Sequence, residues 1–122
     1  MSQPNIIVIL CDQLKATASH LYGSPICTTP QLERMAAEGT LFENAYTPHP
    51  LCVPARISLW TAQYPHTHGG RRNQTLMPPD ATHAFKQWKD LGYKNALLGK
   101  NHCFETEEDM ALFDVWCEAS HH

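Results

Sequence analysis

Hydrophobic residues along this chain are grouped in short runs that predict strands. Residues 5–10 form a run rich in β-branched side chains, which is typical of a strand buried on both faces of a parallel sheet. Residues 93–98 form a second run of this kind, and residues 40–46 are expected to be a strand or an extended segment. The polar residues that follow 5–10 and 93–98 would lie at the carboxyl edge of the sheet, where open α/β sheets bind ligands.

Three other segments have the pattern of helices. Thr29 is a suitable N-cap, Pro30 suits the first helical position, and Gly39 suits the C-terminal stop. Residues 56–61 are expected to be helical, with a start near Pro54. A third helix is indicated by an apolar stripe that ends at a glycine, namely Ala84, Phe85, Trp88, Leu91 and Gly92.

The alternation of strands and helices predicts an α/β fold, with a mostly parallel sheet covered by helices on both faces. Between the predicted elements, residues 64–80 are expected to form a long loop, and residues 105–122 show no clear pattern. A chain of 122 residues is long enough for about one domain of ~100–200 residues.

Charge and composition exclude several classes of function. The chain has 9 basic and 12 acidic residues, a net charge of -3, which argues against a general nucleic-acid binder. Its longest apolar run is far shorter than the ~18 residues that cross a bilayer, and no basic residue precedes it as in a secretory signal. We therefore expect a cytoplasmic protein without a membrane partner. Five cysteines without a CxxC pair are expected to be mostly free thiols.

The most specific motif is Cys52-Val53-Pro54-Ala55-Arg56, a Cys-x-Pro-x-Arg pattern. With its surroundings at residues 47–69, it resembles the signature of the formylglycine-dependent type I sulfatases, which belong to the alkaline phosphatase-like superfamily. Three further segments resemble that family, namely residues 5–13, residues 22–39 and the Gly-Lys-x-His segment at 99–102. The resemblance as a whole covers residues 5–102.

The resemblance implies that Cys52 is oxidised to formylglycine by a formylglycine-generating enzyme. The hydrated aldehyde would attack a small-molecule sulfate ester through one hydroxyl, and its second hydroxyl would expel the sulfate. Arg56 would neutralise charge beside it, and Lys100 and His102 would reach the sulfate oxygens. Asn73, a weaker match, would contact the substrate. A helix that begins near Cys52 would also direct backbone N–H groups at the anion.

The resemblance also implies a divalent metal held by Asp12, Gln13 and the modified Cys52. Oxygen ligands favour a hard cation, so Ca²⁺ is expected, with Mg²⁺ or Mn²⁺ as alternatives. Many sulfatases carry two acids at this position, so Gln13 is a departure that lowers the negative charge of the site.

Sulfatases of this type are several times longer, and they take an Asp with an Asn or His from a later strand as further metal ligands. No Asp-His or Asp-Asn dipeptide follows Cys52. We therefore expect residues 1–122 to be the N-terminal part of a sulfatase catalytic domain, inactive in isolation. Two alternatives stay open: a phosphonate monoester or phosphodiester hydrolase of the same superfamily, and a non-catalytic truncated remnant.

Overall fold

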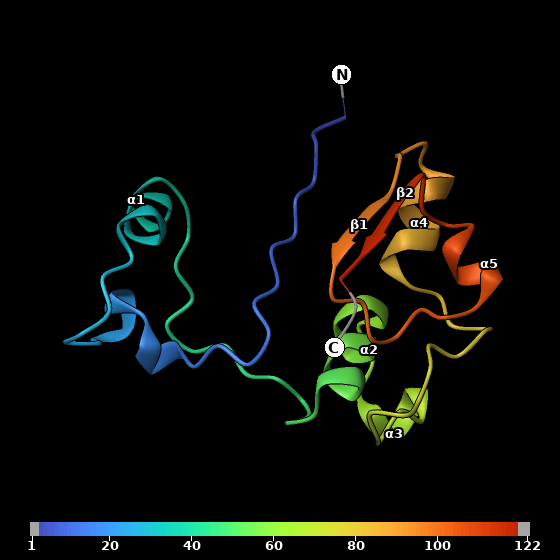
Figure 1. Ribbon diagram of the computed structural model, residues 1–122, viewed down its shortest axis with the longest axis horizontal. Helices are drawn as coiled ribbons and strands as arrows, with labels where there is room; N and C mark the ends of the chain where they lie inside the picture. The colour runs from blue at the N-terminus through green and yellow to red at the C-terminus, as the bar shows by residue number, and fades with distance from the viewer. Residues whose placement is uncertain (1–2, 120–122) are drawn as a thin grey trace. The chain divides into compact units, whose positions relative to one another are not determined.

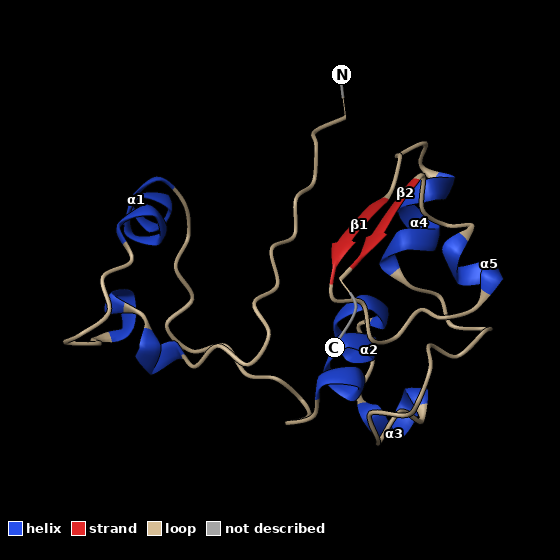
Figure 2. Ribbon diagram, in the orientation of Figure 1, coloured by secondary structure: helices blue, strands red, loops and turns tan. Residues whose placement is uncertain are grey.

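The computed structural model describes residues 3–119, and the chain divides into two compact units, Met1–Ala45 and Tyr46–His122. Figure 1 follows the chain by residue number, and Figure 2 shows where its helices and strands lie. No helix within residues 3–119 is long and apolar enough to span a membrane.

The first unit contains two short 3-10 turns, η1 (Ala16–Ala18) and η2 (His20–Tyr22), and the helix α1 (Pro30–Glu38). The predicted start of this helix at Pro30 and its end before Gly39 are confirmed. Thr29 holds the N-cap position, but its hydroxyl bonds the Ser19 hydroxyl at 3.1 Å instead of capping the helix. The Thr29 N–H donates to Glu33 Oε1 at 3.4 Å, so the carboxylate one turn later accepts the backbone N–H of the N-cap residue.

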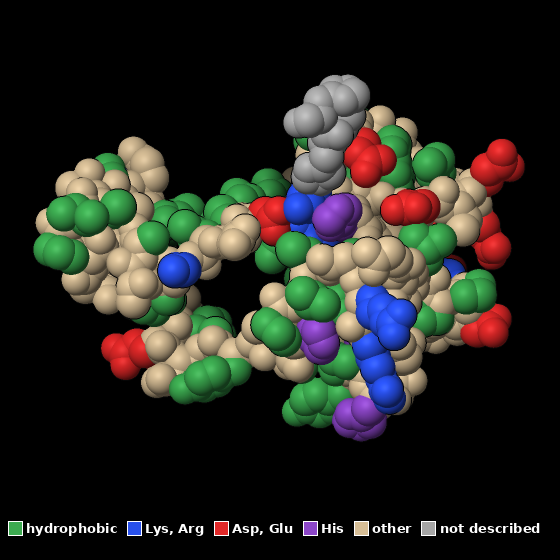
Figure 3. All heavy atoms as spheres, turned by 60° about the horizontal axis from the view of Figure 1, so that its bottom comes forward, with side chains coloured by type: hydrophobic (Ala, Val, Ile, Leu, Met, Phe, Trp, Pro, Cys, Tyr) green, Lys and Arg blue, Asp and Glu red, His purple; other side chains and the backbone are tan. Residues whose placement is uncertain are grey.

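The strand predicted at residues 5–10 is wrong for this chain. Residues 40–46, expected to be a strand or an extended segment, have neither helix nor strand assigned, so only the strand alternative is wrong there. Residues 5–10 have neither helix nor strand assigned, and Ile7 and Ile9 are 82% and 78% exposed. A strand needs the N–H and C=O groups of a neighbouring strand to complete its ladder. Within the described part of Met1–Ala45 no strand supplies them, so the apolar run stays unpaired. Many hydrophobic side chains therefore lie on the surface (Figure 3).

The second unit holds the remaining elements. They are the helices α2 (Cys52–Thr61), α3 (Pro65–His68), α4 (Ala84–Asp90) and α5 (Glu107–Met110), and the strands β1 (Ala96–Gly99) and β2 (Val115–Glu118). The strands pair in parallel, with Ala96 opposite Val115 and Gly99 opposite Glu118. This short sheet with its helices agrees with the predicted α/β class, and the strand expected at 93–98 is confirmed from Ala96 onward.

Three details of this unit differ from the prediction. Helix α2 begins at Cys52, two residues ahead of Pro54. Proline is tolerated in the first helical turn, because the N–H that it lacks would have no helical partner there. The expected long loop at 64–80 contains α3, which Pro65 opens and Gly69 closes. The two strands are not buried on both faces, since Leu98 is 71% exposed and Val115 51% exposed.

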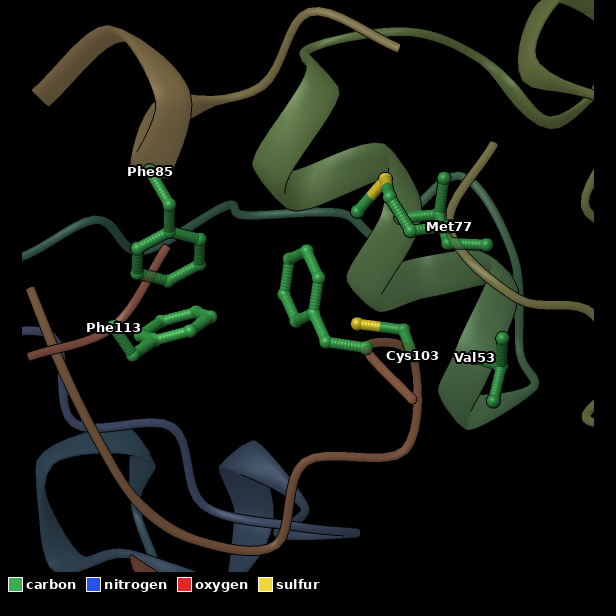
Figure 4. Packing of buried hydrophobic residues seen from close by; sticks show 7 residues of the cluster. Val53, Met77, Phe85, Cys103 and Phe113 are labelled. Atoms are coloured by element: carbon green, nitrogen blue, oxygen red, sulfur yellow. The ribbon is translucent and has the colours of Figure 1, made fainter. Parts of the chain in front are cut away.

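Aromatic rings form the core of the second unit (Figure 4). Phe85 of α4 lies 5.5 Å from Phe104 and 4.8 Å from Phe113, measured between ring centroids. Val53 and Ile57 of α2, both fully buried, belong to the same cluster. The core therefore joins the helix that carries the Cys-x-Pro-x-Arg motif to the segment that follows β1.

One polar side chain lies inside this core. His83 is 1% exposed, and neither of its ring nitrogens has a hydrogen-bond partner among the described residues. Its ring centroid is 5.3 Å from that of Phe104 and 6.2 Å from that of Phe85. Burial lowers the pKa of His83 below its ordinary value, with Lys86 acting in the same direction and Asp109 opposing it.

We expect Phe104→Ala to lower the free energy of unfolding by about 3–5 kcal/mol, because it removes a ring that is 1% exposed at the centre of the core. Urea unfolding of the full chain, followed by near-UV circular dichroism, measures the change. Leu98→Ala is the matched control on an exposed side chain and should shift stability by no more than about 0.5 kcal/mol. Equal effects of the two substitutions would contradict this description of the core.

We also expect the free energy of unfolding to fall as the pH drops below about 6.5. His83 has a lowered pKa in the native state, so the unfolded chain binds a proton more readily than the native one. The stability that comes from neutral His83 is complete above its unfolded pKa and is lost as the pH falls. In His83→Leu the slope of stability against pH between 6.5 and 5 should decrease; an unchanged slope would contradict the assignment.

Candidate active site

Cys52 is the first residue of α2 and is half-buried. The residue before it, Leu51, is the N-cap and has extended backbone angles, φ -88 and ψ 149. The Val53 N–H, next along the helix, donates to Asn73 Oδ1 at 3.2 Å. An amide from the loop after α3 therefore caps the helix beside the cysteine, and backbone N–H groups of this kind carry the positive end of the helix dipole.

Arg56 lies one helical turn after Cys52, and residues four apart share one face of a helix. Its side chain is buried, 8% exposed, and its Nη1 donates to the Lys100 carbonyl oxygen at 3.1 Å. A guanidinium keeps its proton even when buried. The motif therefore fixes a positive charge close to Cys52 and binds α2 to the residue that directly follows β1.

The loop after β1 turns sharply around a buried asparagine. Asn101 Oδ1 accepts from the N–H groups of Cys103 at 3.3 Å and Phe104 at 3.0 Å, and its Nδ2 donates to the Phe104 carbonyl oxygen. Lys100 and His102, on either side of it, are half-buried. Sequence reasoning did not single out Asn101; the available signal is an asparagine two residues after the glycine that ends the strand, where its side chain can bond the turning backbone.

His102 has a positive φ of 70°, a conformation that favours glycine. A non-glycine residue held there costs about 1–3 kcal/mol, and such residues cluster at functional sites. Gln13 has the same feature, with φ 55°. Ala62, at the end of α2, is the third non-glycine residue with positive φ within residues 3–119, so two of the three were singled out from the sequence.

The cysteines of the second unit differ in chemistry. Cys103 is fully buried, and burial raises its pKa to about 12, although nearby Arg56 acts in the opposite direction. Cys103 therefore stays a protonated thiol at neutral pH. Cys52 is half-buried at a helix start, and Cys117 of β2 is exposed.

The structure brings several of the predicted site residues of the second unit together. Cys52, Arg56 and Asn73 meet at the start of α2, and the Arg56 hydrogen bond adds the Lys100–His102 loop. Asp12 and Gln13 are exposed in the first unit, so the metal site expected from them and Cys52 stays a prediction. Within residues 3–119 no group of three or more His, Cys, Asp or Glu side chains could hold a metal ion.

Comparisons with known proteins cover nearly the whole chain. The family model described as Sulfatase matches residues 4–120. An ulvan-active sulfatase of Formosa agariphila is 35% identical over 98% of this chain, and an N-acetylgalactosamine-6-sulfatase of Rattus norvegicus is 34% identical over 93% of it. Each alignment covers 25% of the relative, so the chain spans about a quarter of the length of these curated relatives.

Solved structures give the same result. The crystal structure of Ps i-CgsB matches 99% of this chain with a TM-score of 0.86 and 32% identity, and the match covers 30% of that protein. A structure solved with its substrate D-glucosamine-2-N,6-O-disulfate matches 82% of the chain with a TM-score of 0.73 and 30% identity, over 20% of that protein. The motif, the fold and these similarities agree, and the chain belongs to the sulfatase family.

Proposed function

We propose that this chain supplies the nucleophile-bearing part of a longer catalytic domain that hydrolyses sulfate esters, with Cys52 as the precursor of a formylglycine. The observation that supports the proposal most is the start of α2, where Cys52 lies one turn before a buried Arg56 that donates to the Lys100 carbonyl oxygen at 3.1 Å. This arrangement gathers a reactive position, a fixed positive charge and the Lys100–His102 loop.

The class of substrate that we propose is the sulfate ester of a carbohydrate. Three kinds of relative support it by their names: an ulvan-active sulfatase, an N-acetylgalactosamine-6-sulfatase and an N-acetylglucosamine-6-O-sulfatase. The bacterial N-acetylglucosamine enzyme, from Bacteroides thetaiotaomicron, is 31% identical over 93% of this chain.

A formylglycine at position 52 would supply two hydroxyls on one carbon when hydrated, one to attack sulfur and one to expel the sulfate. The chain's own residues would prepare that position. Arg56 neutralises negative charge next to residue 52, Lys100 binds an oxygen of the sulfate group, and His102 transfers a proton at the departing oxygen. Asn73 keeps the Val53 N–H oriented at the helix start.

The oxygen donors of Asp12 and Gln13 are of the type that hard divalent metals prefer. Asp12 offers a carboxylate and Gln13 an amide oxygen, and both side chains are exposed. Ca²⁺ takes about 6–8 oxygen ligands, so these two supply a part of one shell, with further ligands from the rest of the domain. Mg²⁺ and Mn²⁺ accept the same donors.

We expect conversion of Cys52 when the full chain is produced together with a formylglycine-generating enzyme. Mass spectrometry of the tryptic peptide 35–56, which contains no other cysteine, should show the aldehyde at position 52. Cys11, Cys27, Cys103 and Cys117 should keep their thiols and serve as internal controls. Arg56→Lys keeps the trypsin site and should reduce conversion, because it changes the recognised motif. An unmodified Cys52 in a host that converts other sulfatases would contradict the proposal.

We expect Lys100→Ala to lower the kcat of a polypeptide that continues this chain to the length of its relatives by about 10²–10³-fold, since one preorganised positive charge is lost. Hydrolysis of p-nitrophenyl sulfate measures it, and Cys52→Ala should be inactive. Lys94→Ala, which changes an exposed lysine ahead of β1, is the matched control and should leave kcat unchanged.

The same polypeptide distinguishes the alternatives. A preference for a phenylphosphonate ester over p-nitrophenyl sulfate would indicate a phosphonate hydrolase, and no turnover of either ester would indicate a non-catalytic remnant. A Lys100→Ala variant with normal kcat and KM, beside an inactive Cys52→Ala, would show that the Lys100 loop does not contact the sulfate.

A further inference from the structure

A buried histidine–serine pair joins α2 to α3, and the same histidine bonds the loop that follows α3. Ser58 of α2 is 6% exposed and His68 of α3 is 8% exposed. The Ser58 hydroxyl and His68 Nε2 lie 2.8 Å apart, and His68 Nδ1 accepts from the Gly70 N–H at 3.1 Å. Both ring nitrogens therefore have a partner, one on the helix and one on the loop.

These two contacts fix the protonation of the ring. A backbone N–H can only donate, so His68 Nδ1 must be without a proton to accept from Gly70. The neutral ring then carries its hydrogen on Nε2, which donates to the Ser58 hydroxyl oxygen. A second proton would occupy Nδ1 and remove the bond to Gly70.

Close packing supports the same contact. A Cβ at Gly70 would lie 2.9 Å from His68 Nδ1 and 3.0 Å from Ile57 Cδ1, distances that leave no room for a side chain. Gly69 has a positive φ of 75°, which favours glycine. The two glycines let the loop approach the ring and the helix closely.

The loop then continues to the start of the same helix. Three residues after Gly70, Asn73 Oδ1 accepts from the Val53 N–H at 3.2 Å, next to Cys52. Residues 68–73 thus attach to α2 at two points, its middle through Ser58 and its first turn through Asn73. A displaced loop would leave the first turn without this cap.

We infer that His68, as the neutral Nε2–H tautomer, is a positioning residue that holds residues 70–73 against α2 and so keeps Asn73 on the helix turn that carries Cys52. The role of this positioning in catalysis rests on the proposed function of Cys52, whereas the hydrogen bonds of His68 can be measured without enzyme turnover. His68 touches no substrate in this role, and it acts through Gly70 and Asn73.

The surroundings of His68 oppose its protonation. Burial is the main cause that lowers its pKa, and the histidines His49 and His66 act in the same direction when they are charged, while a backbone hydrogen bond partly opposes them. The contact with Gly70 is therefore complete above about pH 6.5, the ordinary value for histidine. It weakens as the pH falls through the lowered pKa of His68.

The test uses the full chain, with the tautomer read by nitrogen NMR of the imidazole rings and the cap read by hydrogen exchange of the Val53 amide. At pH 7.5 we expect His68 to show a protonated Nε2 and an unprotonated Nδ1. His68→Ala should raise Val53 exchange roughly 2- to 10-fold, the effect of losing about one hydrogen bond. Asn73→Ala should raise it similarly, and the double variant should add little, because both act through one cap.

Two further variants separate the role of each nitrogen. His68→Asn keeps an acceptor near the position of Nδ1 but is too short to reach Ser58, and His68→Gln reaches Ser58 but keeps no acceptor near Nδ1. Each variant should raise Val53 exchange, because the inference needs both contacts of the ring. His66→Ala is the matched control, since His66 lies in the same short helix, is exposed and stacks on Tyr64 at 5.7 Å; it should leave Val53 exchange and the His68 tautomer at pH 7.5 unchanged.

A protonated Nδ1 at pH 7.5, or unchanged Val53 exchange in His68→Ala, would overturn the inference. Exchange that rises equally at every amide of α2 in both His68→Asn and His68→Gln would also overturn it, because the residue would then support the fold in general. Failure of Cys52 conversion would leave all of these readings unaffected, so the two proposals fail separately.

Discussion

The hydrogen bond from buried Arg56 to the Lys100 carbonyl oxygen, 3.1 Å long, is the contact on which the arrangement of the second unit depends most. A guanidinium taken out of water must find acceptors, because a buried charge without them is costly. The carbonyl groups at the end of a strand are such acceptors. The arginine of the motif therefore fixes α2 against the end of β1, and with it the position of Cys52 relative to the Lys100–His102 loop.

Around this contact the polar side chains divide into two kinds. Asn101 and Asn73 bond backbone groups and shape the loops that bear the candidate catalytic residues. Ser58 bonds His68, and His68 accepts from the Gly70 N–H, so this pair holds the loop after α3. Asn101, Asn73 and His68 thus satisfy backbone donors at positions where neither helix nor strand does so, and Ser58 orients the His68 ring.

Several large apolar side chains of this chain are exposed to solvent. Ile7, Ile9 and Ile26 in the first unit and Leu98 in the second are all more than two-thirds exposed. Hydrophobic area of this kind is normally removed from water by further elements of a domain. This exposure agrees with the finding that the chain spans about a quarter of the length of its curated relatives. In those relatives the remaining length would supply strands and helices that cover such side chains.

The sequence by itself determined what depends on neighbouring residues: Pro30 and Gly39 bound α1, Gly92 follows α4, and Cys52 with Arg56 marks the family. Tertiary structure alone decided the rest, because it depends on contacts between distant residues. The run at 5–10 has strand character but no partner strand among residues 3–119, and β2, with no clear sequence pattern, forms by pairing with β1. The Asn73 cap and the His68 tautomer likewise require a helix and a loop to meet, which no local pattern encodes.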